Sequence, residues 1–386
     1  MTSLPATRPL HVWHLITGLA PGGTEFMLHR LLATMDRGAV RSTVASLTAG
    51  GSVADQIRGL GTPLHTLGMR PGAPDPRGML RLLRLMRADP PDVLQTWLYH
   101  ADLLGLVGAR LARVPHLVWN IRCSEMDARY ERGMGGLILR TLARFSGSPD
   151  AVVVNSEAGR TLHRDRGYHP RRWEMMPNGF DLSRFVPDPD AGARLRAEIG
   201  AGAGEPLVGL IARYDPVKGH ALFFAAAERL LAGIPDARFV LAGTGVRLDN
   251  PAFAGLIPPA VAGRVHLLGE RRDVPYVTAA LDVATCASTG EGFPNVIGEA
   301  MASGIPVVTT DVGDARAIVA DCGIVVPPQD AAALTRAWAE VLRRPVAERR
   351  ALGQRARARI AQHYDIHVIA DRYVALYREL AMRPPA

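Results

Sequence analysis

The chain has 386 residues, a hydrophobic content of 48% and a mean hydropathy of +0.06. This length is sufficient for two domains with full cores, and no apolar run is long enough for a membrane span. Three cysteines, Cys123, Cys286 and Cys322, are too few and too scattered for a disulfide framework or a zinc site. Because the first residues also lack the apolar core of a signal peptide, the sequence predicts a cytoplasmic globular enzyme.

The net charge of +8 is unevenly distributed. Residues 1–187 hold 23 arginines and 15 acidic residues, whereas residues 188–386 hold 22 basic and 22 acidic residues. Nucleic acid, anionic lipid or a phosphorylated acceptor would each account for a basic first half. A solubilising surface charge accounts for it equally well.

Short apolar runs alternate with amphipathic stretches through the first half of the chain. This alternation predicts a parallel sheet covered by helices on both faces. The predicted strands are Leu10–Leu19, Thr43–Leu47, Val93–Thr96, Leu117–Ile121 and Ala151–Asn155. The clearest predicted helices between them are Glu25–Met35, Met79–Met86 and Ala101–Arg113.

The pattern restarts after a break at residues 186–191, where Asp188-Pro-Asp190 is interpreted as a turn rather than a metal-binding motif. A second set of strands and a helix over Ile366–Leu380 follow. The fold class is therefore α/β, with two Rossmann-like doubly wound domains facing a central cleft. The strands of the second set are Leu207–Ala212, Arg238–Ala242, Val265–Leu268, Val283–Ala287 and Val307–Thr310.

A single lysine, Lys218, accompanies forty-four arginines in this sequence. It follows a predicted strand and lies five residues after Arg213. Because arginine replaces lysine everywhere else, this position is predicted to require an ammonium group. The alternative is a lone lysine that survived by chance in an arginine-biased composition.

The segment from Glu291 to Glu299 predicts a ligand-binding helix N-terminus. Pro294 suits the first turn of a helix that runs over residues 295–303 and stops at Gly304. Free amides and the positive end of the helix dipole would bind phosphate at the carboxyl edge of a parallel sheet. Glu299 lies among apolar neighbours and needs a partner, for which ribose hydroxyls are suited.

Two cations in the same half of the chain supply charge for a diphosphate. A departing nucleoside diphosphate gains negative charge, and the Arg213 guanidinium and the Lys218 ammonium would stabilise it. No convincing cluster of metal ligands is visible in the sequence, so no metal and no cofactor are expected. These features together predict a site for a sugar nucleotide.

Several motifs occur in one order along nearly the whole chain and resemble the retaining glycosyltransferases of family 4, which have the GT-B fold. They are Gly22-Gly23-Thr24-Glu25, Pro177-Asn178-Gly179-Phe180-Asp181, the Arg213 and Lys218 pair, Gly243-Thr244-Gly245 and the Glu291–Gly304 segment. The resemblance implies metal-independent sugar transfer from a nucleoside-diphosphate sugar with retention of configuration. It implies an acceptor domain over residues 1–187, a donor domain over 188–365, and a last helix over 366–386 that crosses back to the first domain.

The same resemblance assigns roles to individual residues. Arg213 and Lys218 would bind the diphosphate, Glu299 the ribose and Glu291 the transferred sugar, so that Arg213, Lys218 and Glu291 form the catalytic set. The remaining donor-binding positions would be Gly22, Gly23, Gly245, Gly292, Phe293, Asn295 and Val296. For Gly22 and Gly23 an ordinary strand-to-helix turn is an equally good interpretation.

The acceptor side departs from the family pattern. Many members carry a histidine near the sugar after the fourth or fifth strand, but this sequence has Asn120 and Arg122 there. His100, at a predicted strand-to-helix loop, is another candidate for acceptor or sugar contact, and a packing histidine is the alternative. The acceptor itself would be a glycan or a lipid-linked glycan.

Two arginine-rich amphipathic stretches in the basic half, residues 77–87 and 129–144, suit the surface of an anionic bilayer. They give the hypothesis of a peripheral protein on the inner face of the membrane. Ordinary sheet-covering helices with a solvated arginine face are the alternative.

Other functions remain open at this point. A sugar-nucleotide epimerase or a glycosyl phosphorylase would use the same fold. A nucleic-acid-binding protein would use the basic half, but its arginines alternate with leucine and methionine rather than with aromatic residues. A nicotinamide dehydrogenase is disfavoured because the first loop lacks the GxGxxG pattern.

Overall fold

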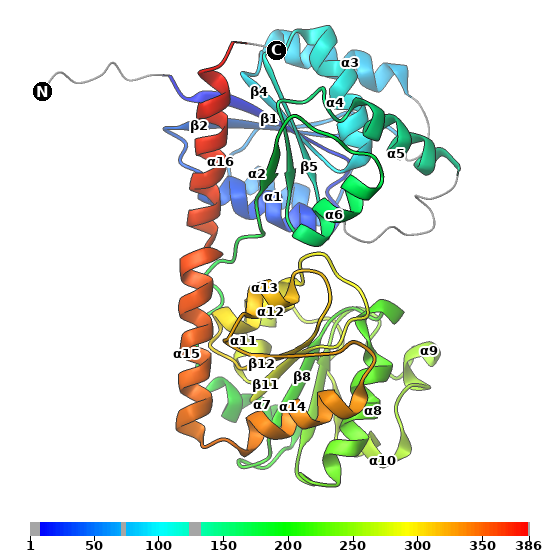
Figure 1. Ribbon diagram of the computed structural model, residues 1–386, viewed down its shortest axis with the longest axis vertical. Coiled ribbons are helices and arrows are strands. Elements are labelled where there is room, and N and C mark those ends of the chain that lie inside the picture. Colours follow the sequence, from blue (N-terminus) through cyan, green and yellow to red (C-terminus); the bar gives the residue numbers. More distant parts are fainter. Residues whose placement is uncertain (1–7, 71–74, 123–132, 385–386) are drawn as a thin grey trace, which may run out of the picture. The chain divides into compact units, whose positions relative to one another are not determined.

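The computed structural model describes residues 8–70, 75–122 and 133–384, and it divides into two compact units (Figure 1). The first unit comprises Met1–Gly179 and Ile366–Ala386, and the second comprises Phe180–Asp365. The division after Gly179 lies earlier than the predicted boundary at 187/188. Residues 180–187 therefore belong to the second unit, and the C-terminal residues belong to the first.

The first unit is built on a parallel sheet of seven strands in the order β3-β2-β1-β4-β5-β6-β7. The order reverses beside β1, and in other doubly wound sheets ligands bind at the carboxyl ends of the strands at such a reversal. The strands are β1 (Leu10–Ile16), β2 (Val40–Ser46), β3 (Leu64–Thr66), β4 (Val93–Trp97), β5 (His116–Ile121), β6 (Ala151–Val154) and β7 (Trp173–Met175).

Helices cover both faces of this sheet (Figure 1). One face packs on α1 (Gly23–Thr34), α2 (Ser52–Gly59) and the C-terminal helix α16 (Ile366–Ala381). Tyr373 and Tyr377 of α16 are fully buried in that core. The opposite face packs on three adjacent helices, and α6 (Glu157–Asp165) follows β6. The three adjacent helices are α3 (Pro76–Ala88), α4 (Tyr99–Ala112) and α5 (Gly133–Phe145).

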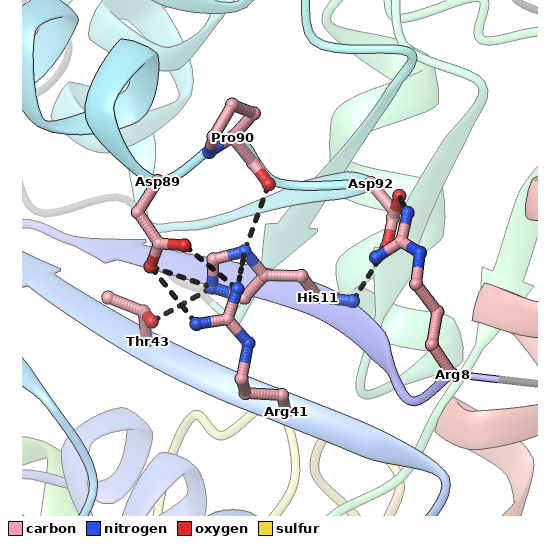
Figure 2. A network of polar contacts seen from close by, with 7 residues as sticks. All are labelled: Arg8, His11, Arg41, Thr43, Asp89, Pro90 and Asp92. Atoms are coloured by element: carbon pink, nitrogen blue, oxygen red, sulfur yellow. Dashed lines mark hydrogen bonds and ion pairs between the residues drawn. The ribbon is translucent and has the colours of Figure 1, made fainter.

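A polar network fixes the amino ends of β1, β2 and β4 (Figure 2). The buried His11 ring lies 3.0 Å from the Thr43 hydroxyl and 3.0 Å from the Pro90 carbonyl. Arg41 donates to both carboxylate oxygens of Asp89, and burial lowers the pKa of His11. Because ligands of parallel sheets bind at the carboxyl edge, this cluster at the opposite edge is structural.

The second unit is built on a parallel sheet of six strands in the order β10-β9-β8-β11-β12-β13. Its strands are β8 (Leu207–Ile211), β9 (Arg238–Ala242), β10 (Val265–Leu267), β11 (Val283–Cys286), β12 (Val307–Thr310) and β13 (Ile324–Val326). One face packs on α7 (Ala191–Ile199), α11 (Val274–Ala279), α12 (Asn295–Ala302), α13 (Ala315–Val319) and α15 (Val346–His363). The other packs on α8 (His220–Leu231), α9 (Pro251–Ala254), α10 (Pro259–Ala262) and α14 (Ala331–Arg343).

The α/β class and the two doubly wound sheets confirm the predicted fold, but three strands were not predicted. β3, β7 and β13 have three residues each, and most of their side chains are half-buried at sheet edges. β3 and β7 lack a continuous apolar run, and the apolar run of β13 has only three residues, fewer than the roughly four to eight of a typical buried strand. The predicted first strand was also too long, because β1 ends at Ile16 and residues 17–19 form the following loop.

Candidate functional site

A pocket of about 300 Å³ lies at the carboxyl ends of β8 and β11 in the second unit. The segments that build it are the ends of these two strands, the turn that carries Lys218, and the start of α12. Among the predicted site residues, its walls bring together Arg213, Lys218, Glu291, Phe293, Asn295, Val296 and Glu299.

Lys218 forms an ion pair with Glu291 in this pocket. Its Nζ atom donates to Glu291 Oε1 over 2.6 Å, and the Ser288 hydroxyl donates to the same oxygen over 2.7 Å. The side chains of Lys218 and Glu291 are only 21% and 13% exposed. The lone lysine and the first glutamate of the acidic segment are therefore direct partners, which is not evident from their separation in sequence.

The turn before α8 sets the position of Lys218. Residues 216–218 form one 3₁₀ turn, in which the Asp215 carboxylate accepts from the Val217 amide over 3.1 Å. Gly219 then takes a left-handed conformation, with φ of +69°, and approaches the Ala287 carbonyl closely. A side chain at position 219 would meet that carbonyl, so glycine allows this turn to pack against the end of β11.

The loop after β11 is held from several sides. The Thr310 hydroxyl donates to the Ser288 carbonyl over 2.6 Å, and the Thr289 amide donates to the Val217 carbonyl over 2.8 Å. The Asp314 amide donates to the carbonyl of Gly292 over 2.9 Å. These bonds fix the backbone on both sides of Glu291. Ser288 was not predicted as part of the site; its only signal is a polar residue at the end of a buried strand.

The N-terminus of α12 faces the pocket. The helix begins at Asn295, and Pro294 is its N-cap rather than a first-turn residue, which corrects the prediction by one position. Pro294 has no side chain that could cap the helix, and the positive end of the helix dipole is suited to an anion. Phe293 is buried and stacks on Phe180, with ring centroids 6.1 Å apart. The partly exposed Glu299 lies one turn further along.

Arg213 lines this pocket, whereas two of the predicted glycines do not. The Arg213 side chain is 65% exposed and donates to Asp215 over 2.9 Å. Gly245, with φ of +79°, lies in the loop after β9, next to the segment of Arg213. Gly245 and Gly292 are not among the residues that line the pocket, although Gly292 adjoins two that are.

Gly22 and Gly23 lie in the first unit at the start of α1. Gly22 is the N-cap, with an extended φ of −167°, and Gly23 is the first helical residue. The partly buried Glu25 carboxylate lies over this helix end, and its pKa is raised by burial. Because Gly22 has only a hydrogen as its side chain, this end of the helix has room for the Glu25 carboxylate.

The candidate acceptor residues of the first unit lie at the carboxyl ends of β4 and β5. Asn120 is fully buried, and its amide donates to the Tyr373 hydroxyl over 3.1 Å. Arg122 is partly buried and donates to the Asn120 side chain over 3.1 Å. Asn120 therefore supports Arg122 and is not exposed for a direct contact. Burial lowers the pKa of His100, at the start of α4.

Residues 8–70, 75–122 and 133–384 contain no group of three or more histidine, cysteine, aspartate or glutamate side chains placed to hold a metal ion. Cys123 lies outside these ranges. Within the same ranges, no helix has the length and hydropathy needed to cross a membrane.

Two family models match the chain. The model described as Glycosyltransferase Family 4 matches residues 21–184, and the one described as Glycosyl transferases group 1 matches residues 205–344. Each match lies almost entirely within one structural unit. Together they cover every strand of the two sheets except β1, and they include the pocket of the second unit.

Curated relatives and solved structures agree with these models. The chain is 30% identical to a GDP-mannose-dependent α-(1-6)-phosphatidylinositol monomannoside mannosyltransferase of Mycolicibacterium smegmatis, over 70% of this chain and 72% of that protein. It is 24% identical to a UDP-Gal:α-D-GlcNAc-diphosphoundecaprenol α-1,3-galactosyltransferase of Escherichia coli, over 64% of each chain. That match spans slightly less than two thirds of the Escherichia coli protein. The fold matches Anabaena HepE in complex with UDP and glucose, with a TM-score of 0.81, 21% identity and coverage of 95% and 99%.

Proposed function

The chain belongs to glycosyltransferase family 4, and from this premise we propose that it transfers a sugar from a nucleoside-diphosphate sugar to a glycan or lipid-linked acceptor. The observation that carries the proposal is the pocket of the second unit. There the ammonium of Lys218 and the guanidinium of Arg213 line the same pocket as the N-terminus of α12. Cationic side chains and a helix N-terminus in one pocket suit a diphosphate.

The proposed reaction is metal-independent and retains the anomeric configuration. The bond from the anomeric carbon to the β-phosphate oxygen breaks, and the acceptor hydroxyl oxygen bonds to the same face of that carbon. The acceptor proton passes to the departing phosphate. Arg213, Lys218 and the helix amides stabilise the charge that develops on the diphosphate, which favours the transition state over the bound substrate.

Glu291 and Glu299 serve the other parts of the donor in this proposal. Glu291 is oriented by Lys218 and Ser288, so its second oxygen can accept from sugar hydroxyls. Glu299 accepts from the ribose. Because Lys218 is already paired with Glu291, the ammonium links the sugar-binding carboxylate to the diphosphate and is held in place before the donor arrives.

The names of two relatives support a lipid-linked acceptor. The Escherichia coli and Mycolicibacterium smegmatis proteins are named for acceptors that are lipids bearing a diphosphate or a phosphatidyl group. We propose by analogy that this chain acts in cell-envelope polysaccharide or glycolipid synthesis. A sugar-nucleotide epimerase or a phosphorylase would also bind the donor, so dependence on an acceptor is the decisive property.

A nucleoside-diphosphate panel tests the donor site directly. With EDTA present, one of UDP, GDP, ADP and dTDP is expected to raise the melting temperature of the wild-type protein. At a hundred times the dissociation constant the gain is about 2.7 kcal/mol, which is readily visible as a shift. Glu299→Ala is expected to lose most of it, because the ribose hydroxyls lose their acceptor. Differential scanning fluorimetry measures both.

The control for this experiment is Glu340→Ala, which removes an exposed carboxylate that pairs with Arg344 on the same unit. It should leave the nucleotide shift unchanged. Stabilisation that appears only when a divalent metal replaces EDTA would contradict metal independence. Stabilisation by a nucleotide with sugar turnover that needs no acceptor would favour the epimerase.

The first unit has a surface suited to an anionic membrane, and we propose that the protein docks there. It is formed by α3, α4 and α5, of which α4 contacts both others. The only acidic residue in these helices is Asp102, which is buried. The exposed apolar residues are Leu80, Val107, Leu111, Met134, Leu137 and Phe145. The exposed arginines are Arg77, Arg81, Arg84, Arg87, Arg110, Arg140 and Arg144. Residues 129–132 of the predicted basic stretch lie outside the described ranges.

Co-sedimentation with vesicles tests the docking. Wild type is expected to bind phosphatidylglycerol-containing vesicles and not purely zwitterionic ones. A triple variant, Arg77→Gln, Arg84→Gln and Arg140→Gln, is expected to bind on the order of a hundredfold more weakly, since each arginine contributes about 1 kcal/mol at such a surface. Arg37→Gln, Arg58→Gln and Arg160→Gln remove as much charge from other exposed sites of the first unit. Equal weakening by both triples would point to net charge rather than to this surface.

A further inference from the structure

Arg122 is held by a set of neutral groups in the first unit. Its guanidinium donates to the side-chain oxygens of Asn120 and Asn178, and through Nη2 to the Tyr373 hydroxyl over 2.5 Å. It also lies over the Trp97 ring, with the guanidinium carbon 5.2 Å from the ring centroid. Three partners and a ring from different parts of the chain therefore fix this side chain in one position.

The charge of Arg122 is not balanced by these partners. Among the described residues, none of its contacts is a carboxylate, whereas other partly buried arginines of the protein, such as Arg196 and Arg172, pair with one. Arg196, for example, donates to Asp282, and Arg172 donates to Glu174 and Glu379. A partly buried cation without a counter-charge is costly to keep unless an anion binds to it.

The geometry leaves the guanidinium able to bind such an anion. Arginine has five N–H donors, and the three neutral partners take one each, from Nε, Nη1 and Nη2. One N–H remains on each terminal nitrogen, in the fork arrangement that suits a phosphate or carboxylate. Arg122 also directly follows β5, at the carboxyl edge where parallel sheets bind ligands.

We propose that Arg122 binds an anionic group, phosphate or carboxylate, carried by the acceptor, and that Asn178 and Tyr373 are positioning residues for it. This inference rests on the proposed function for the existence of an acceptor. It adds the substrate class: the preferred acceptor bears an anion close to the sugar or hydroxyl that is glycosylated. The Trp97 ring and the neutral cradle keep the guanidinium oriented and leave its charge for the ligand.

Anion binding is tested first by calorimetric or thermal titration of the full-length protein. The donor pocket is saturated with the nucleoside diphosphate that stabilises the protein most, and methyl phosphate or acetate is added at constant ionic strength. Wild type and Arg37→Gln, which removes an exposed arginine bonded to the Leu60 carbonyl, are expected to bind one of the two anions. Arg122→Gln is expected to bind it about 10- to 100-fold more weakly.

Tyr373→Phe separates positioning from charge. It keeps Arg122 but removes the hydroxyl, so the affinity for the anion is expected to fall several-fold, less than in Arg122→Gln. Arg122→Lys should recover part of the affinity, because it restores the charge without the fork. If Arg122→Gln binds both anions as wild type does, or if wild type binds neither, the inference is overturned.

Steady-state transfer distinguishes the acceptor from the donor as the source of the anion. With an acceptor that bears the anion, Arg122→Gln is expected to raise the KM for acceptor about 10- to 100-fold and to leave the KM for donor unchanged. A rise in the donor KM alone would assign Arg122 to the donor and overturn the inference. Failure of every nucleoside diphosphate to bind wild type would instead overturn the proposed function, and the anion titration can then be run without nucleotide.

Discussion

Lys218→Met is expected to lower kcat about 10²- to 10³-fold, because it removes a fixed cation from the developing charge of the leaving diphosphate. Lys218→Arg keeps the charge, but a guanidinium does not fit where the Nζ atom lies 2.6 Å from Glu291 in a largely buried pair. Its kcat is expected to fall at least about tenfold, since a small misplacement of a catalytic group is costly. Steady-state kinetics with saturating donor measures both.

A double mutant separates catalysis from stability in this pair. Lys218→Met leaves the Glu291 carboxylate without its cation, and the unfolding free energy of the second unit is expected to fall by about 1–3 kcal/mol. Lys218→Met with Glu291→Gln should recover much of that stability and none of the activity. Arg344→Met, which breaks an exposed pair with Glu340, is the control and should change neither property. Wild-type kcat in Lys218→Met would remove the ammonium from the mechanism.

Gly219→Ala is expected to destabilise the second unit and to lower kcat at least about tenfold. A Cβ atom at this position would lie 1.9 Å from the Ala287 carbonyl oxygen, so the turn that carries Lys218 must move. The left-handed backbone adds about 1–2 kcal/mol of strain, and the steric overlap adds about 1–3 kcal/mol. Thermal unfolding and steady-state kinetics measure the two effects.

Gly200→Ala is a matched control for this variant. Gly200 ends α7 with φ of +66° and ψ of +31°, close to the +69° and +30° of Gly219, but nothing lies within 4 Å of its Cβ position. It therefore shows the backbone strain without the overlap. The melting temperature of Gly219→Ala should be lower than that of Gly200→Ala by about 5 °C. Equal melting temperatures and full activity in both would show that the turn tolerates a side chain at position 219.

The proposals for the two units predict effects on different properties of the protein. Variants of Lys218 and Glu299 are expected to affect the donor, whereas variants of Arg122 are expected to affect the acceptor. Removing arginines from α3 and α5 should change membrane binding without changing the transfer of sugar to a water-soluble acceptor. A variant that violates this separation would identify which proposal fails.

Ten strands of the two sheets, five of their helices and the acidic segment of the site could be predicted from the amino-acid pattern alone. Central parallel strands are continuous apolar runs, and α12 and α16 have strong local patterns, so these elements were predicted to within a few residues. The residues of α12 reach one pocket because they are neighbours on one helix. The edge strand β3 was missed because it has no continuous apolar run, and β13 was missed because its apolar run has only three residues.

Only the tertiary structure decided which distant residues are partners. Lys218 and Glu291 are separated by 73 residues, and Arg122 and Tyr373 by 251. Each pair meets because strand order and helix packing bring two segments to one sheet edge. The local periodicity of the sequence does not indicate which segments pack together in this way. For the same reason the local pattern could not show that Asn120 donates to Tyr373 of α16 and accepts from Arg122. Local sequence thus fixed the secondary structure and the chemistry of the side chains, and the fold fixed their partners.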